Sequence, residues 1–308
     1  MSNKNRFQPL DASRIGLMLS VMSTMLVKKR IGDLLLVGYS VAGVESVIVA
    51  PELNVAFDVG RAPSEVVPID TVCLTHGHMD HAAGIAYYFS QRNFIGNSPG
   101  RIIVPHRLGQ PVQALMGVWA DIEGHHSPGE VIAIEPGEEV AIRRNLLVRS
   151  FAVNHGIAAL GYSVIEVRHK LKPEYKNYSG PQLVELKKKG ISIEHRLEVP
   201  LVAYCGDTAL GPFLDEDCVR NAQVLLLECT FFDHDHLVRA RAGRHIHVAD
   251  LPEVMRRVRS PHVVLTHLTQ RTDMRFARQV LADSLEKVDL GRITFLMERT
   301  RRNQRNSG

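Results

Sequence analysis

The sequence is poor in cysteine and in aromatic residues: its 308 residues include four cysteines and one tryptophan. No two cysteines have Cys-x-x-Cys spacing, so the composition gives no sign of a disulfide scaffold. Cys73 and Cys205 stand inside apolar runs, where cysteine usually packs as a small core side chain. A reducing compartment, the cytoplasm, is therefore the expected location.

A membrane-length apolar run is also absent. The N-terminal apolar stretch, residues 15–27, has 13 residues, well short of the roughly 20 that a membrane-spanning helix needs. Three basic residues (28–30) follow it without a small-residue cleavage site, so no signal peptide is expected. The stretch predicts a helix packed on the domain surface, and no contact with a membrane.

The chain carries no strong net charge. A net charge of +4 and a pI of about 8.9 are compatible with an anionic partner. They do not require one, because an enzyme acting on a neutral substrate could carry the same charge.

Short apolar runs predict strands, and periodic stretches between some of them predict helices. The expected strands are 33–38, 45–50, 54–58, 71–75, 102–104, 146–153, 201–205, 223–228 and 262–266, and the expected helices are 81–92, 109–120, 249–259 and 274–286. Strands mixed with helices over this length indicate an α/β fold of packed layers. We expect residues 1–308 to form one domain, with an N-terminal extension at 1–30 and a basic tail at 299–308.

Residues 166–199 differ from their surroundings. Between residues 168 and 196 there are eight lysines and arginines against three glutamates, a net charge of +5. The segment is interpreted as a basic arm inserted between two core strands. A solvated surface helix over 182–189, which contains Lys187, Lys188 and Lys189, is the alternative.

The densest group of potential metal ligands lies in Thr75-His76-Gly77-His78-Met79-Asp80-His81, directly after an apolar run. Three imidazoles and a carboxylate within six residues are unfavourable in a core. They suit zinc, which binds neutral histidine nitrogens and carboxylate oxygens. Gly77 permits a sharp turn that lets the side chains around it converge.

Three further candidates each follow a strand-like run: His155, Asp207 and His267. His155 or His267 alone would more often be a structural histidine. Ligands at the same ends of neighbouring strands lie on one edge of a sheet, where α/β folds gather their active sites. Together with the histidine block, they predict a metal site on that edge.

Seven ligands are too many for one tetrahedral zinc ion and suit two. The natural division assigns His76, His78 and His155 to one ion and Asp80, His81 and His267 to the other, with Asp207 bridging both. Two such ions generate a hydroxide near neutral pH and stabilise an in-line displacement at phosphorus. A carboxylic or sulfuric ester would suit the same pair, so the ligands alone leave the substrate open.

Further motifs accompany the ligands in a fixed order. They are Asp58-Val59-Gly60, the pair Gly161-Tyr162 after His155, the arm sequence 170–180 (KLKPEYKNYSG), residues 225–231 (LLLECTF) and residues 243–248 (GRHIHV). The ordered set, over about residues 32–275, resembles the metallo-β-lactamase superfamily and, within it, ribonuclease Z in its short plant-type form. The resemblance implies an αββα sandwich with a short inserted basic arm.

The resemblance also implies a function: a two-zinc phosphodiesterase that cleaves the 3′ trailer from precursor tRNA by attack of a metal-bound hydroxide. Mn²⁺ and Fe²⁺ are possible in place of Zn²⁺, and a homodimer is expected. Asp80 would orient or deprotonate the hydroxide, and His247, supported by Glu228, would protonate the leaving 3′-oxygen. His245 is the nearest alternative to His247, which could instead be a capping or surface histidine.

Two features depart from the family pattern. The final motif, His-x-Ser-x-Arg-Tyr, is here His267-Leu-Thr-Gln-Arg-Thr, in which Thr269 keeps a hydroxyl and Arg271 a phosphate-binding fork but the tyrosine is missing. The arm, where Lys187, Lys188 and Lys189 would contact tRNA, is shorter than in typical bacterial forms. Two other functions stay open: a hydrolase of a small phosphodiester, lactone or aryl sulfate, and a nucleic-acid-binding protein with little turnover.

Overall fold

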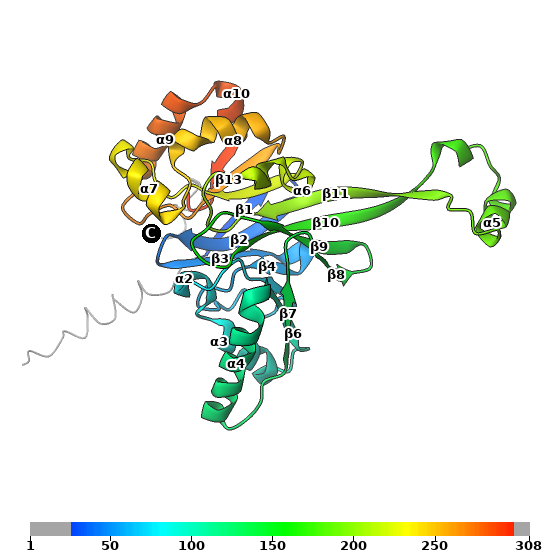
Figure 1. Cartoon of the computed structure of the whole chain (residues 1–308), viewed down its shortest axis with the longest axis horizontal. Helices are drawn as coiled ribbons and strands as arrows, with labels where there is room; N and C mark the ends of the chain where they lie inside the picture. Colours follow the sequence, from blue (N-terminus) through cyan, green and yellow to red (C-terminus); the bar gives the residue numbers. More distant parts are fainter. Residues whose placement is uncertain (1–25, 299–308) are drawn as a thin grey trace, which may run out of the picture.

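Two seven-stranded sheets pack face to face and helices cover both outer faces in the computed structural model, which describes residues 26–298 (Figure 1). In spatial order, the first sheet comprises β1 (Val27–Ile31), β2 (Leu34–Val41), β3 (Glu45–Ala50), β4 (Val55–Phe57), β5 (Thr71–Cys73), β6 (Gly100–Pro105) and β7 (Gly129–Ile134). The second comprises β14 (Ile293–Phe295), β13 (His262–Thr266), β12 (Val224–Glu228), β11 (Glu194–Tyr204), β10 (Leu160–Leu171), β9 (Leu146–Ala152) and β8 (Glu139–Arg143). The four-layer α/β architecture expected from the sequence is therefore present.

The helices fall into two groups. Beside the first sheet are α2 (Met79–Ala82), α3 (Ile85–Phe94) and α4 (His106–Glu123); beside the second are α6 (Asp217–Arg220), α7 (Leu237–Gly243), α8 (Leu251–Arg257), α9 (Met274–Ser284) and α10 (Lys287–Leu290); α5 (Gly180–Lys188) lies apart from both (Figure 1). Single 3₁₀ turns are η1 (Pro51–Leu53), η2 (Pro173–Tyr175), η3 (Pro212–Asp215), η4 (His234–His236) and η5 (Val248–Asp250).

Alternate side chains along the central strands pack into different hydrophobic cores. In β3, Val47 and Val49 pack under the helices of the first sheet, whereas Ile48 belongs to the core between the sheets. In β12, Leu225 likewise faces the outer helices and Leu226 the inner core. Side chains of a strand point alternately to its two faces, and both faces are buried here, so residues 47–50 of β3 and 224–227 of β12 are all apolar.

All nine predicted strands are present, but β1, β7, β8, β10 and β14 were not expected. Four of these five are the edge strands of the two sheets. β1, for example, is Val-Lys-Lys-Arg-Ile with alternate residues exposed. Edge strands commonly carry charged residues that block further pairing, so they lack the apolar run that identifies a central strand.

The predicted helices differ from the structure at two places. The helix expected over 81–92 is two helices, because Gly84 separates α2 from α3 and a Cβ there would lie 2.4 Å from the backbone nitrogen of Ala62. The helix expected over 15–27 lies mostly outside the described residues, and from Val27 onward the chain is strand β1. The basic tail at 299–308 is also outside them.

The inserted arm projects far from the sandwich (Figure 1). β10 pairs with β9 from Leu160 to Glu166, and from there to Leu171 it pairs only with β11. The two strands thus leave the sheet as a ribbon, with α5 at its tip. The arm and the alternative surface helix are therefore parts of one structure.

Candidate metal centre

The seven predicted ligands lie together at one edge of the sandwich because of strand direction. β9, β11, β12 and β13 all run the same way, since β10 is antiparallel to both β9 and β11 while the other pairs are parallel. Their carboxyl ends therefore share an edge, where His155, Asp207 and His267 follow β9, β11 and β13. The histidine block follows β5 of the first sheet. An isolated β-bridge between His76 and Ala159 connects this block to the loop that contains His155.

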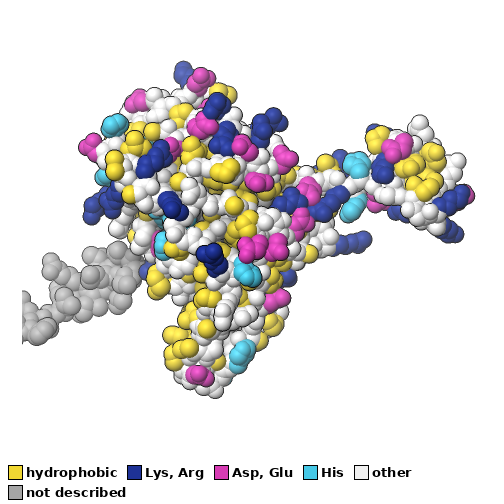
Figure 2. All heavy atoms as spheres, viewed as in Figure 1, with side chains coloured by type: hydrophobic (Ala, Val, Ile, Leu, Met, Phe, Trp, Pro, Cys, Tyr) yellow, Lys and Arg dark blue, Asp and Glu magenta, His cyan; other side chains and the backbone are white. Residues whose placement is uncertain are grey.

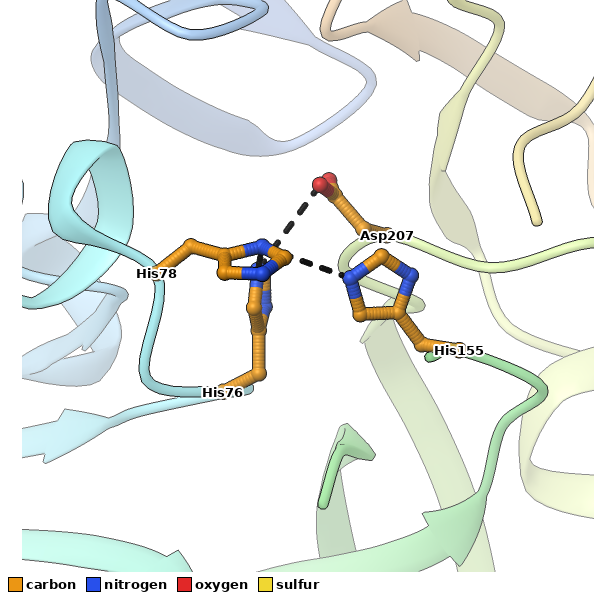
Figure 3. A group of neighbouring side chains, drawn as sticks. All are labelled: His76, His78, His155 and Asp207. Carbon is orange, nitrogen blue, oxygen red and sulfur yellow. Dashed lines mark hydrogen bonds and ion pairs between the residues drawn. The ribbon is translucent and has the colours of Figure 1, made fainter. Parts of the chain in front are cut away.

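One group of ligands comprises His76, His78, His155 and Asp207 (Figure 3). His78 Nδ1 lies 3.0 Å from His76 Nε2 and 3.4 Å from His155 Nε2. Asp207 Oδ2 lies 3.7 Å from His76 Nε2. The side chains come from three separate loops and point toward one another, with one ligand atom from each within 4.8 Å of the others.

A second group comprises Asp80, His81 and His267. Asp80 Oδ2 lies 3.6 Å from His81 Nε2 and 3.5 Å from His267 Nε2. Asp207 Oδ1 lies 3.5 and 3.4 Å from the same two nitrogens. The two oxygens of Asp207 therefore face different groups, the arrangement that a bridging carboxylate needs.

The cluster fits a divalent metal site. Asp207 Oδ1 is buried and has no hydrogen-bond partner among the described residues, although buried polar atoms are almost always satisfied. Imidazole nitrogens and carboxylate oxygens lie 3.4–3.7 Å apart around the centre, and a bound cation between them would attract both kinds of atom. Nitrogen and carboxylate oxygen donors in this combination are typical of zinc and other first-row divalent ions.

The electrostatics of the cluster favour the deprotonated, metal-binding forms of His76, His155 and Asp207, and they favour a positive charge at His81. Burial, followed by the charge of His81, lowers the pKa of His76 to about 2, and burial lowers the pKa of His155 to about 4. Burial alone would raise the pKa of Asp207, but the surrounding histidines hold it below its usual range. Burial also opposes charge on His81, yet Asp207 and Asp58 raise its pKa to about 9.

A carboxylate outside the ligand set orients two of the histidines. Asp58 Oδ2 accepts a hydrogen bond from His81 Nδ1 at 2.7 Å, which leaves His81 Nε2 for the centre. Asp58 Oδ1 accepts a hydrogen bond from the Thr75 hydroxyl. The Thr75 hydroxyl oxygen in turn accepts one from His76 Nδ1 at 3.0 Å. Partners of this kind fix the tautomer of a metal-binding histidine. The sequence identifies Asp58 only as part of a motif, because its contacts with His81 and Thr75 depend on the fold.

Glu228 makes a second orienting network. Its Oε2 accepts from the Thr230 hydroxyl at 2.5 Å, and Thr230 Oγ1 lies 3.1 Å from His267 Nδ1. Its Oε1 accepts from His245 Nδ1 at 2.8 Å. Burial lowers the pKa of His245, but the hydrogen bond and charge of Glu228 outweigh burial and raise it.

The expected support of His247 by Glu228 is not what the structure shows. His247 Nδ1 accepts from the Ala249 backbone N–H at 3.1 Å, and His247 Nε2 donates to the Asp233 backbone oxygen at 2.9 Å. It is the N-terminal cap of η5 and is 3% exposed. The two histidines are two residues apart in the sequence, and the fold turns His245 toward Glu228 and His247 toward backbone groups. Arg244, which precedes them, has a left-handed φ of 55°.

A cleft of about 530 Å³ opens onto the centre. Its walls include Asp80, Asp207, His245 and His267, together with Gly43, Phe231, His236, Arg239, Thr269, Gln270 and Arg271. The predicted substrate residues Thr269 and Arg271 thus adjoin the metal ligands. Lys187, Lys188 and Lys189 lie at the end of α5 on the arm, away from the cleft (Figure 1).

Comparison with known proteins identifies the family. The chain matches the beta-lactamase superfamily domain over residues 43–268. It is 33% identical to tRNase Z TRZ1 of Arabidopsis thaliana over 76% of this chain and 85% of that protein. It is 32% identical to the chloroplastic tRNase Z TRZ2 of the same plant, over 82% of this chain and 72% of that one. The chain belongs to the tRNase Z family of the beta-lactamase superfamily.

A solved structure supports the fold assignment. The short form of human tRNase Z has a TM-score of 0.55 at 18% identity, covering 76% of this chain and 91% of that one. The predicted family, the αββα fold and the enzyme class, a metal-dependent hydrolase, are confirmed. None of the helices formed by residues 26–298 is long and apolar enough to span a membrane.

Proposed function

We propose that this protein is an endoribonuclease that removes the 3′ trailer from precursor tRNA, with two zinc ions held by the seven ligands. The observation that carries the proposal is the two-part His/Asp centre, which shares one cleft with the His245–Glu228 pair. The named activity of the Arabidopsis relatives supports this assignment.

The chain's own residues would act as follows. Asp207 would hold both ions, and the backbone N–H of Gly43 fixes the Asp80 carboxylate at 2.9 Å. Bound there, the ions would supply positive charge that stabilises the phosphoryl oxygens and acidifies water. Because Glu228 occupies Nδ1 of His245, Nε2 is the nitrogen available to give a proton to the leaving 3′-oxygen.

The test is incubation of zinc-loaded protein with a 3′-extended precursor tRNA, beside bis(p-nitrophenyl) phosphate. We expect one cut after the acceptor stem, a 3′-hydroxyl on the tRNA and a 5′-phosphate on the trailer, because water is the nucleophile. A 2′,3′-cyclic phosphate would contradict that chemistry. Hydrolysis of the small diester with no cleavage of tRNA would favour a small-molecule hydrolase.

The basic arm is proposed to hold the body of the tRNA. Two of its three consecutive lysines are paired, Lys187 with Glu194 at 2.8 Å and Lys189 with Glu185 at 2.6 Å. In the described chain, Lys172, Lys176 and Lys188 have no ion pair. These three free ammonium groups are therefore better placed than the lysine run as a whole to contact phosphates.

Replacing Lys172, Lys176 and Lys188 together by glutamine should weaken precursor tRNA binding. Each lost phosphate contact should also lower the slope of log affinity against log salt by about 0.9. Fluorescence anisotropy at several salt concentrations measures both effects. Cleavage of bis(p-nitrophenyl) phosphate, which is too small to reach the arm, should change less than twofold; equal losses on both substrates would mean that the arm supports the fold.

A homodimer is proposed through α4. Leu115, Val118, Trp119 and Ile122 recur at helical spacing on one exposed side of this helix, with Val118 and Ile122 58% and 66% exposed. Phe94, 83% exposed, ends the adjacent α3. Hydrophobic side chains, drawn in yellow, gather over the region of α3 and α4 in Figure 2. Monomers rarely expose so continuous an apolar stripe, and a twofold axis would pair it with itself.

Val118→Glu should convert the dimer to a monomer, because two buried carboxylates would face each other across the axis. Sedimentation equilibrium measures the mass. Val288→Glu is the matched control, since Val288 is 71% exposed on α10 at a different surface. A dimer that survives Val118→Glu would place the interface elsewhere.

The cytoplasm is proposed as the compartment. All four cysteines are free and buried, as expected in a reducing environment. Imaging of a fluorescent fusion tests this, and the chloroplastic Arabidopsis relative makes an organelle the competing outcome.

A further inference from the structure

Three arginines lie on or next to α7, and two of them are used inside the fold. Arg241 Nη1 donates to Asp250 at 2.7 Å, and Arg244 Nη1 donates to the backbone oxygen of His155 at 2.7 Å. Arg239 is exposed, and within residues 26–298 no carboxylate or hydrogen-bond acceptor pairs with its guanidinium. Its donors are therefore available to a ligand.

An aromatic ring holds Arg239 at the cleft. Its Cζ lies 5.7 Å from the centroid of Phe231, within cation–π range. Phe231 is 7% exposed and packs edge-on against His236 and His245, with centroids 5.7 and 6.1 Å apart. Arg239 and the proposed proton donor, His245, therefore contact the same ring and line the same cleft.

Arg271 is the other cleft arginine. It is exposed and, like Arg239, has no carboxylate partner in the described part of the chain. A guanidinium with free donors is well suited to phosphate, which it can bind through two parallel hydrogen bonds. The scissile phosphate would lie at the metal ligands. Arg239 would therefore contact a different phosphate of the same RNA strand.

We propose that Arg239 binds the phosphate of a nucleotide adjacent to the scissile one, so that the cleft takes at least two consecutive nucleotides of an RNA strand. This inference rests on the proposed function and adds a substrate-binding residue to it. An isolated diester has no second phosphate and cannot use this contact.

The test compares Arg239→Ala, Arg239→Lys and the control Arg275→Ala, an exposed arginine of α9 outside the cleft. Arg239→Ala should raise KM for precursor tRNA about tenfold with kcat within threefold, a loss well above that on bis(p-nitrophenyl) phosphate. Binding of a fluorescent single-stranded RNA should lose about 0.7 of salt slope, the value for one phosphate on a single strand. Arg239→Lys should be intermediate because it keeps the charge, and Arg275→Ala should match the unmodified protein.

Two results would overturn the inference: equal losses on both substrates, which would make Arg239 a support of the centre, or unchanged RNA affinity and KM. Failure of the unmodified protein to cut precursor tRNA would instead contradict the proposed function. In that case the RNA affinities of the variants would still decide the role of Arg239. Melting curves and metal content of each variant show that the fold and the centre are intact.

Discussion

Asp207→Ala should abolish hydrolysis of both precursor tRNA and bis(p-nitrophenyl) phosphate and leave the protein unable to hold two metal ions. Asp207 is the one ligand whose oxygens face both groups, with Oδ2 3.7 Å from His76 and Oδ1 3.4 Å from His267. Its loss would also remove a carboxylate that lies within 3.7 Å of His76, His81 and His267, and the missing negative charge would weaken the binding of a cation at the centre.

Metal analysis after dialysis measures the stoichiometry and identifies the metal, with Zn²⁺ expected and Mn²⁺ or Fe²⁺ as the competing results. Asp283→Ala is the control, because Asp283 is an exposed carboxylate on α9 whose side chain, among residues 26–298, accepts a hydrogen bond only from Gln279. Two ions and normal turnover in Asp207→Ala would contradict the bridging role.

His245→Ala should lower kcat by about 10²–10⁴-fold, the usual contribution of a general acid, while the metal content stays unchanged. His245 lines the cleft and is held by Glu228, whereas His247 is buried and turned toward backbone groups. His247→Ala should therefore act on stability instead. It removes a helix cap, which typically costs about 1 kcal/mol of folding free energy, and kcat should remain within a few-fold of normal.

Single-turnover rates, metal content and melting temperature of the two variants, measured side by side, separate the roles. His245 also lies near Asp207 and His267 in a third possible ligand group. If His245→Ala loses metal together with activity, His245 is a ligand and not the proton donor. A larger kinetic loss in His247→Ala than in His245→Ala would restore the expectation drawn from the sequence.

The sequence by itself determined the central strands and the place of the seven candidate ligands after them. β3 and β12 are buried on both faces, so residues 47–50 and 224–227 of these strands are all apolar. The histidine block needs no long-range information either, because four ligands within six residues can converge through local turns alone. Strand-end placement of His155, Asp207 and His267 followed from the same apolar runs, since a polar ligand directly after a buried strand stands at its end.

Only the tertiary structure decided which neighbours act on those ligands. Asp58 and His81 are 23 residues apart, and Thr230 and His267 are 37 apart, so no local pattern predicts their hydrogen bonds. The choice between His245 and His247 depended on which of them the chain turns toward Glu228, the last residue of β12. The edge strands and the ion pairs of the arm lysines could likewise not be predicted from the sequence. Exposure and ion pairing are set by packing and not by residue type.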